Sequence, residues 1–140
     1  MNNYQSGAVS DDMGKLLLRA TLAILILLHG IAKIFNGVGG VMGMVGKLGL
    51  PAEFGYLVYV GEVVAPLLVL LGIATRPAAL VMAINMVFAV VLAHMGDLFS
   101  LTKTGGWALE LQAMFLVGAL SVALLGAGRY SVAGSGGRWN

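Results

Sequence analysis

The hydrophobic positions of the chain fall into four long runs, separated by short polar or glycine-bearing segments. Each run has about 20 mostly apolar residues, the length of α-helix that crosses the roughly 30 Å hydrocarbon core of a bilayer. The runs cover residues 16–35, 54–73, 77–95 and 107–125. The pattern therefore predicts an all-α integral membrane protein built as a four-helix bundle.

The segment between the first two runs, residues 36–53, is rich in glycine. Its apolar side chains recur at helical spacing and end before Pro51, which breaks the chain ahead of the second run. They are Val41, Met44, Val45 and Leu48. We predict a short helix in the membrane interface here, either a lid over a cavity or a passive float.

Both ends of the chain differ from its middle. The first 14 residues are polar, with Asp11 and Asp12 ahead of the first run, and the last 13 are rich in glycine and serine. Such segments are typically mobile. We therefore predict flexible tails at residues 1–14 and 128–140, on either side of one transmembrane domain at residues 15–127.

The composition agrees with a bilayer environment and excludes several kinds of chemistry. The chain is 59% hydrophobic and 10% charged, with a mean hydropathy of +0.95. It has no cysteine, which excludes disulfide exchange, iron–sulfur ligation and thiolate metal sites on this chain alone. No basic, aromatic-rich stripe is present, so we expect no nucleic-acid partner.

The basic residues near the span ends predict an orientation. Five lie on the side of the termini and three on the opposite side, and cytoplasmic loops carry the excess of Lys and Arg. The two groups are Lys15, Arg19, Arg76, Arg129 and Arg138, against Lys33, Lys47 and Lys103. We expect a multi-pass protein of the bacterial inner membrane with both termini in the cytoplasm.

Every span also carries polar side chains, although a charge near the bilayer centre is costly unless it is paired or hydrated. At 1.5 Å per residue, most of the ionisable ones lie toward the face opposite the termini, and the glutamate of the second span lies deeper. The set is His29, Lys33, Glu62, Asn85, His94, Glu110 and Gln112.

Glu62 is the position that most favours a function. Pro66 has no N–H to donate to the carbonyl oxygen of Glu62, so both the backbone and the side chain of Glu62 need other partners. Tyr59, one turn away, is a candidate donor. Lys33 lies one turn after His29, so a cationic head on that face of the first span can reach a carboxylate on a neighbouring helix.

Other polar residues also have structural interpretations. Asn85 and Gln112 are typical of side chains that only join helices together. His94 and Lys33 can equally extend to the headgroups. Asn85 and His94 are nine residues apart, which is half a turn in net rotation, so we expect that both do not line one pocket equally.

A haem or metal site is the less favoured interpretation. Two histidines at similar depth are typical haem ligands, and with Glu62 and Glu110 they resemble a metal set. However, Lys33 would repel a metal cation, and no tight ligand motif is present. We therefore expect no metal.

Several motifs resemble the DoxX family of small membrane proteins. They are His29-Gly30-Ile31-Ala32-Lys33, Gly49-Leu50-Pro51, Glu62, the turn block Gly72-Ile73-Ala74-Thr75-Arg76-Pro77-Ala78-Ala79, and Gly106-Trp107-Ala108-Leu109-Glu110-Leu111. The resemblance covers residues 16–128. It implies a four-helix bundle and, by likeness to a subunit of a thiosulfate:quinone oxidoreductase, a link to redox complexes.

The leading hypothesis is therefore a membrane subunit of an oxidoreductase complex, with an outer-facing polar cavity that holds a quinone. In it Glu62 and Glu110 relay protons, Lys33 stabilises a developing anion, and the ligand-binding residues are His29, His94, Tyr59 and Asn85. The partner would be a redox protein or a second copy of the chain. The alternatives are a non-catalytic anchor or assembly protein and a lipid or small-solute binding protein.

Overall fold

The computed structural model describes residues 3–134 and 136–140, and within them the fold is all-α. Residues 1, 2 and 135, which fall within the two predicted tails, lie outside the described residues. The helices are α1 (Asn3–Asn36), α2 (Gly39–Lys47), the 3₁₀-helix η1 (Ala52–Leu57), the π-helix η2 (Val60–Val64), α3 (Ala65–Leu71), α4 (Thr75–Ala93), the 3₁₀-helix η3 (Met95–Asp97) and α5 (Glu110–Leu125). The predicted all-α bundle with a short helix after its first member is confirmed.

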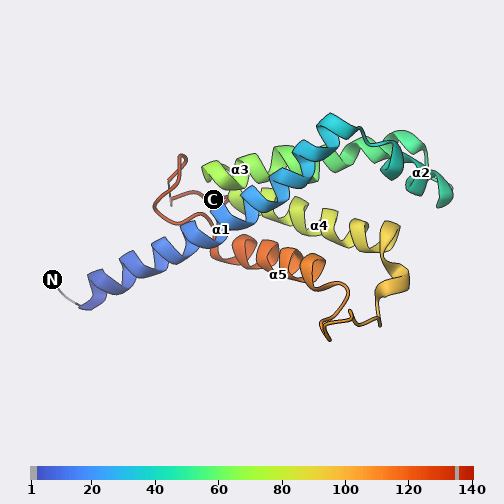
Figure 1. The fold of residues 1–140 in the computed structure, drawn as a ribbon. Helices are drawn as coiled ribbons and strands as arrows, with labels where there is room; N and C mark the ends of the chain where they lie inside the picture. Colours follow the sequence, from blue (N-terminus) through green and yellow to red (C-terminus); the bar gives the residue numbers. More distant parts are fainter. Residues whose placement is uncertain (1–2, 135) are drawn as a thin grey trace.

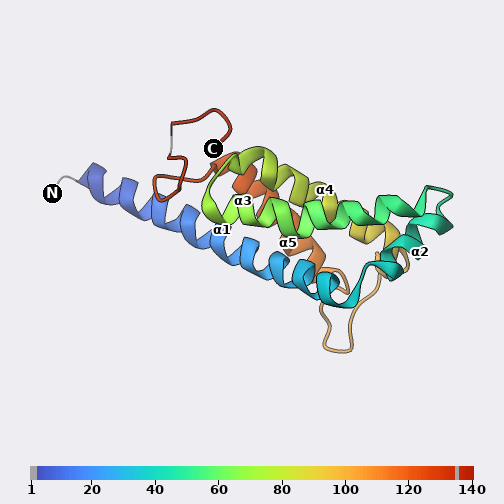
Figure 2. The ribbon, with the colours of Figure 1, turned by 90° about the horizontal axis from the view of Figure 1, so that it is seen from above.

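Four long helical segments form the bundle (Figure 1). They are α1, the continuous segment from η1 through α3, α4 and α5; α1 packs against α3 and α5, and α4 packs against the same two helices. Both termini lie at one end, while α2 and η1 lie at the other (Figures 1 and 2). An even number of antiparallel helices produces this arrangement.

Three helical segments in the described part of the chain are long and apolar enough to cross a membrane: Gly7–Asn36, Ala52–Leu71 and Thr75–Ala93. The fourth, α5, has 16 residues and is about 24 Å long at 1.5 Å per residue. It begins three residues later than its hydrophobic run, because the carboxylate of Glu110 accepts a hydrogen bond from the Trp107 N–H at 2.9 Å and closes a turn there. These apolar helices make the chain an integral membrane protein.

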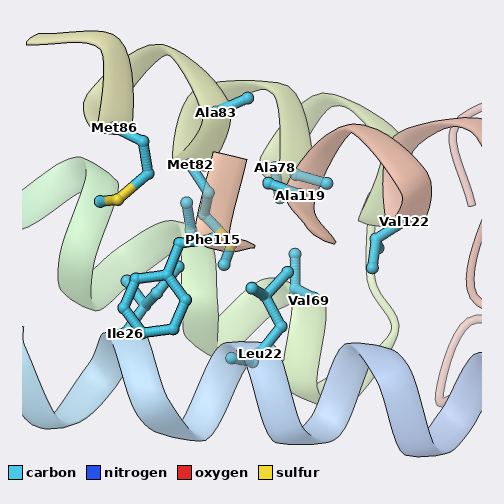
Figure 3. Packing of buried hydrophobic residues seen from close by; sticks show 13 residues of the cluster. Leu22, Ile26, Val69, Ala78, Met82, Ala83, Met86, Phe115, Ala119 and Val122 are labelled. Carbon is cyan, nitrogen blue, oxygen red and sulfur yellow. The ribbon is translucent and has the colours of Figure 1, made fainter. Parts of the chain in front are cut away.

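The hydrophobic core lies toward the end of the bundle that carries the termini. Buried side chains of all four helical segments meet there (Figure 3). Small residues of α4 and α5 let these helices approach closely, and larger side chains of all four helical segments fill the centre. The core comprises Leu22, Ala23, Ile26, Ala65, Val69, Ala78, Ala79, Met82, Ala83, Met86, Phe115, Ala119 and Val122. The cavity described below begins beside this core, at Val60, Glu62 and Val81, and extends toward α2.

The described parts of the two predicted tails differ, since the N-terminal one is helical and the C-terminal one consists of turns and irregular chain. A helix occupies the described part of residues 1–14, because α1 begins at Asn3, and its first turns extend beyond the bundle (Figure 1). The C-terminal segment folds back on the bundle end: buried Asn140 accepts a hydrogen bond from the Thr75 hydroxyl at 2.6 Å, and Arg76 donates to the Leu124 carbonyl at 2.9 Å. These contacts join α4, α5 and the last residues.

Arg19 was expected only as an orienting charge, yet its side chain is 1% exposed. Its guanidinium donates to the carbonyl oxygens of Val69 (2.8 Å), Leu70 (2.6 Å) and Ala127 (3.2 Å), and also to that of Tyr130. Two of these carbonyls, those of Val69 and Leu70, belong to the last turn of α3, and that of Val69 also accepts from the Gly72 N–H at 3.2 Å. Arg19 therefore satisfies the C-terminal end of α3 from inside the bundle.

Candidate functional site

A glycine in α1 determines how closely the first two spans approach. Gly30 lies against the backbone of Glu62: a Cβ at Gly30 would stand 2.2 Å from that carbonyl oxygen, far inside any normal contact. The approach brings Lys33, one turn later, level with the Glu62 side chain. The Gly30-to-Lys33 spacing of the sequence motif thus has a direct structural reason.

The backbone around Glu62 is a π-helix rather than an α-helix. In η2 the Ala65 N–H donates to the carbonyl oxygen of Val60, five residues earlier, immediately before Pro66. Such wide turns relieve the missing proline N–H and occur often at functional sites. The π-turn places the Glu62 side chain, which is 7% exposed, toward α1 and α4.

Glu62 is the centre of a polar cluster that joins three helices. The Lys33 ammonium lies 2.5 Å from Glu62 Oε2, and the Asn85 side-chain amide donates to Glu62 Oε1 at 3.3 Å. Gly61 allows α4 this close, because a Cβ there would stand 2.5 Å from Asn85 Cβ. We call Lys33, Glu62 and Asn85 the inner cluster.

Tyr59 adjoins the inner cluster without bonding to Glu62. Its hydroxyl donates instead to the carbonyl oxygen of Lys33 at 3.0 Å, in the last turn of α1, where the Gly37 N–H also donates to this oxygen at 2.8 Å. Tyr59 thus fixes the backbone that carries the Lys33 side chain. Tyr59, the candidate donor to Glu62, therefore has the Lys33 carbonyl as its partner, and the Glu62 carboxylate accepts from Lys33 and Asn85.

The inner cluster forms one wall of a cavity of about 690 Å³ between α2, the η1–η2 segment and α4. This volume is in the range of sites for small organic ligands, which are mostly apolar with a few polar groups. The rest of the wall is almost wholly hydrophobic: Val41, Met44 and Val45 of α2, Leu48 just after it, Phe54, Leu57, Val58 and Val60 of the second span, and Val81, Ile84, Phe88, Ala89, Leu92 and Ala93 of α4.

The cavity opens sideways from the bundle. Leu57 and Val60 on one lip, and Ile84 and Phe88 on the other, line it and yet are 43–62% exposed. In a membrane-spanning bundle, side chains exposed at this depth face lipid. A hydrophobic molecule dissolved in the bilayer can therefore enter between the two lips.

His94 lines the same cavity as Asn85, so the expectation that these residues face opposite ways is wrong. The half-turn argument assumes a continuous helix, but α4 ends at Ala93 and His94 leaves it with φ −132°. Its Nδ1 lies 3.3 Å from Asp97 Oδ2, and its Nε2 lies 3.2 Å from Gln112 Nε2. His94, Asp97 and Gln112 form what we call the outer cluster.

Sequence reasoning missed Asp97, although its spacing of three residues from His94 is a usable signal in a tight turn. Nine residues along α4 separate the inner and outer clusters by about 13 Å at 1.5 Å per residue. A single quinone ring is much shorter than this. One ring therefore contacts one cluster only.

His29 and Glu110 lie apart from the cavity lining. The His29 ring is exposed and stands edge-on to Phe115 of α5, with ring centroids 5.9 Å apart and planes at 76°. The Glu110 carboxylate is exposed and bonded to the Trp107 N–H in its own turn. Of the seven residues expected at the site, the structure places Lys33, Glu62, Asn85 and His94 in the wall of one cavity, and Tyr59 adjoins it through its bond to the Lys33 carbonyl.

No group of three or more His, Asp or Glu side chains among the described residues is arranged to hold a metal ion. The polar groups in the cavity wall are the Lys33–Glu62 ion pair, the Asn85 amide and the His94 imidazole, which is hydrogen-bonded at both nitrogens. This set suits hydrogen bonding to the oxygens of a neutral organic molecule.

Comparison with known proteins gives one curated relative and one family match. A curated protein of Bacillus subtilis (strain 168), named “Putative oxidoreductase CatD”, is 33% identical over 82 residues, which are 59% of this chain and 60% of that protein. The aligned part is thus less than two thirds of the relative's length. No solved structure matches the chain.

The DoxX family model matches residues 14–95. These residues contain most of α1, all of α2 through α4 and the whole inner cluster, together with His94. The block at residues 106–111, which also resembles the family, falls outside the match. Since the model covers more than half of the sequence, the chain belongs to the DoxX family.

Proposed function

We propose that this chain is the quinone-binding membrane subunit of an oxidoreductase complex in the bacterial inner membrane, with both termini in the cytoplasm. The observation that carries the proposal is the inner cluster in the wall of a lipid-accessible, otherwise apolar cavity. The oxidoreductase named among the chain's relatives supports the class of reaction. A redox protein partner supplies the electrons.

The inner cluster has the chemistry that a quinone head requires. A quinone accepts two electrons and two protons, and its carbonyl oxygens accept hydrogen bonds in both the oxidised and the reduced forms. Lys33 uses one ammonium N–H for Glu62 and has two others, and Asn85 has a second amide N–H. In this proposal Lys33 stabilises negative charge on the oxygen and Glu62 holds the proton to be transferred.

In this proposal His94 lies on the path by which protons reach the cavity. Gln112 Nε2 donates to His94 Nε2, which leaves the Nδ1 proton directed to Asp97. Because the outer cluster lies too far along α4 to share a ring with Glu62, His94 serves the passage of protons to the cavity. His29 and Glu110, apart from the cavity lining, have no direct role.

One observation favours the rival function, a non-catalytic anchor or assembly protein. The inner cluster joins α1, η2 and α4, and buried polar groups of this kind often only hold membrane helices together. Glu62→Gln alone does not separate the two functions, because it leaves Lys33 unpaired and breaking a buried pair costs about 3–5 kcal/mol. A test must remove both charges.

The test is the double variant Lys33→Met, Glu62→Gln, which has no unpaired charge. Under the proposal it still assembles with its partner, while quinone reduction by membranes that contain it falls about a hundredfold or more, as expected for loss of a positioned proton donor. The matched control is Lys47→Met, Glu53→Gln, which removes the same charges at two exposed positions off the cavity.

Two outcomes would decide against the proposal. Full quinone reduction by the assembled double variant shows that the inner cluster only joins helices. Loss of assembly in the double variant but not in the control supports the anchor function instead. Assembly is followed by recovery of the partner with the tagged chain.

A further inference from the structure

A second, smaller recess lies beside the cavity on the lipid-facing side of the bundle. It is a groove of about 210 Å³ between α3 and α4. Val64, Ala65 and Leu68 line it on one side, and Ala74, Pro77 and Ala78 on the other. Every side chain in its wall is apolar, so the groove offers hydrogen bonds from none of them.

The groove continues the cavity. Val60 and Val81, which face each other across the second span and α4, line both recesses. From these two residues the cavity extends toward α2, whereas the groove runs the opposite way, toward the turn between α3 and α4. A molecule with its head at Glu62 therefore has an apolar track leading away from it.

The groove is recessed because its floor is made of small residues. Ala65 is 2% exposed and Ala78 is 5% exposed, while Val60 and Val64 stand up beside them at 43% and 50%. Lipid tails are as apolar as this groove, so hydrophobic burial alone gives little preference for any one chain. A hydrocarbon chain prefers this groove only when it is attached to a head group bound in the cavity, because the attachment raises the local concentration of the chain in the groove.

On the basis of the proposed function, we propose that the groove holds the first part of the hydrocarbon side chain of the quinone bound in the cavity. The ligand class is accordingly a membrane quinone with a long apolar chain rather than a free benzoquinone or naphthoquinone head. The inner cluster binds the quinone head, and the groove between α3 and α4 binds the first part of its hydrocarbon chain.

The first experiment maps the tail. The purified full chain, in lipid nanodiscs of phosphatidylethanolamine and phosphatidylglycerol, is labelled with a benzoquinone whose alkyl chain carries a diazirine close to the ring. The expected result is label within residues 60–81, suppressed by unlabelled decyl-substituted benzoquinone. Label on the outer faces of α1 or α5, or label that the competitor does not reduce, overturns the inference.

The second experiment blocks the groove. Val64→Trp puts a large ring on its wall, and Val87→Trp adds the same ring at a position of equal exposure, 49% against 50%, outside both recesses. We expect Val64→Trp to weaken binding of the decyl-substituted quinone about fivefold or more at equal mole fraction in the bilayer, as overpacking of a filled site does. Val87→Trp and binding of the unsubstituted head should be unaffected.

The outcomes separate this inference from the function on which it rests. If neither quinone binds the wild-type chain, both fail. If both quinones bind equally well and Val64→Trp changes neither, the groove is not a tail site, whereas quinone binding in the cavity stands.

Discussion

At the scale of single residues, Gly30 and Gly61 matter as much as the charged side chains they bring together. A Cβ at Gly30 would meet the Glu62 backbone at 2.2 Å, and one at Gly61 would meet Asn85 at 2.5 Å. Three helices therefore approach through glycine contacts, and the inner cluster forms where they meet. The polar residues alone were visible in the sequence; the two contacts that align them were not.

Gly30→Ala is a direct test of this packing. The methyl group has no space against a backbone carbonyl, so α1 and η2 must separate, at a cost of about 1–3 kcal/mol, typical of overpacking. We expect a lower midpoint of thermal unfolding in nanodiscs. Gly43→Ala is the matched control, because nothing lies within 4 Å of its Cβ position in α2 and alanine favours helix. Equal midpoints for the two variants would refute the close contact.

At the scale of elements, the role of α2 follows from its contact with η1 and from the cavity that it lines. Val41, Met44 and Val45 of α2 and Leu48 just after it line the cavity, and α2 rests on η1 where a Cβ at Gly55 would stand 2.7 Å from Met42 Cγ. The helical spacing predicted this helix, and the structure confirms that the four residues face one recess. Of the two roles left open by the sequence, the contacts favour a cover.

Gly55→Leu should separate α2 from η1 at the Gly55–Met42 contact and leave the hydrophobic core intact. We expect trypsin to cleave after exposed Lys47 about ten times faster, since the local opening of α2 becomes easier by about 1.4 kcal/mol, with no change in the unfolding midpoint. Gly43→Leu adds the same side chain where α2 meets nothing within 4 Å. An unchanged cleavage rate in Gly55→Leu would show that α2 does not depend on this contact.

The elements also show where sequence reasoning stops. The hydrophobic runs predict the bundle because the length and polarity of a span are constrained by the bilayer itself. The half-turn argument for Asn85 and His94 failed at the end of α4, since helical periodicity no longer applies beyond Ala93. Arg19 was counted as an orienting charge, and only the fold reveals that it binds the carbonyls at the end of α3.

At the scale of the whole molecule, the bundle is divided along its length. The end that carries the termini has the filled core and the two arginines that bind helix C-termini, and the opposite end has the cavity, α2 and the outer cluster. The inner cluster thus lies beyond the filled core. This division allows the inner cluster to be altered without loss of the core.

The orientation of this molecule in the membrane is testable because the chain has no cysteine. Thr102→Cys lies in the loop beyond α4, and Asp11→Cys lies near the N-terminus; both positions are exposed. With the termini in the cytoplasm, a membrane-impermeant maleimide should label Thr102→Cys in intact spheroplasts and Asp11→Cys only after permeabilisation. The reverse pattern would place the cavity on the cytoplasmic side.

The most direct test of the account is quinone binding by the purified chain in nanodiscs, measured as bound decyl-substituted benzoquinone per chain over a range of mole fractions. The account predicts saturation at about one quinone per chain for the wild type and for Lys47→Met, Glu53→Gln, because each chain has one such cavity in its described part. It predicts loss of saturable binding in Lys33→Met, Glu62→Gln with the unfolding midpoint largely kept. Equal saturable binding by a folded double variant, or none by the wild type, would contradict it.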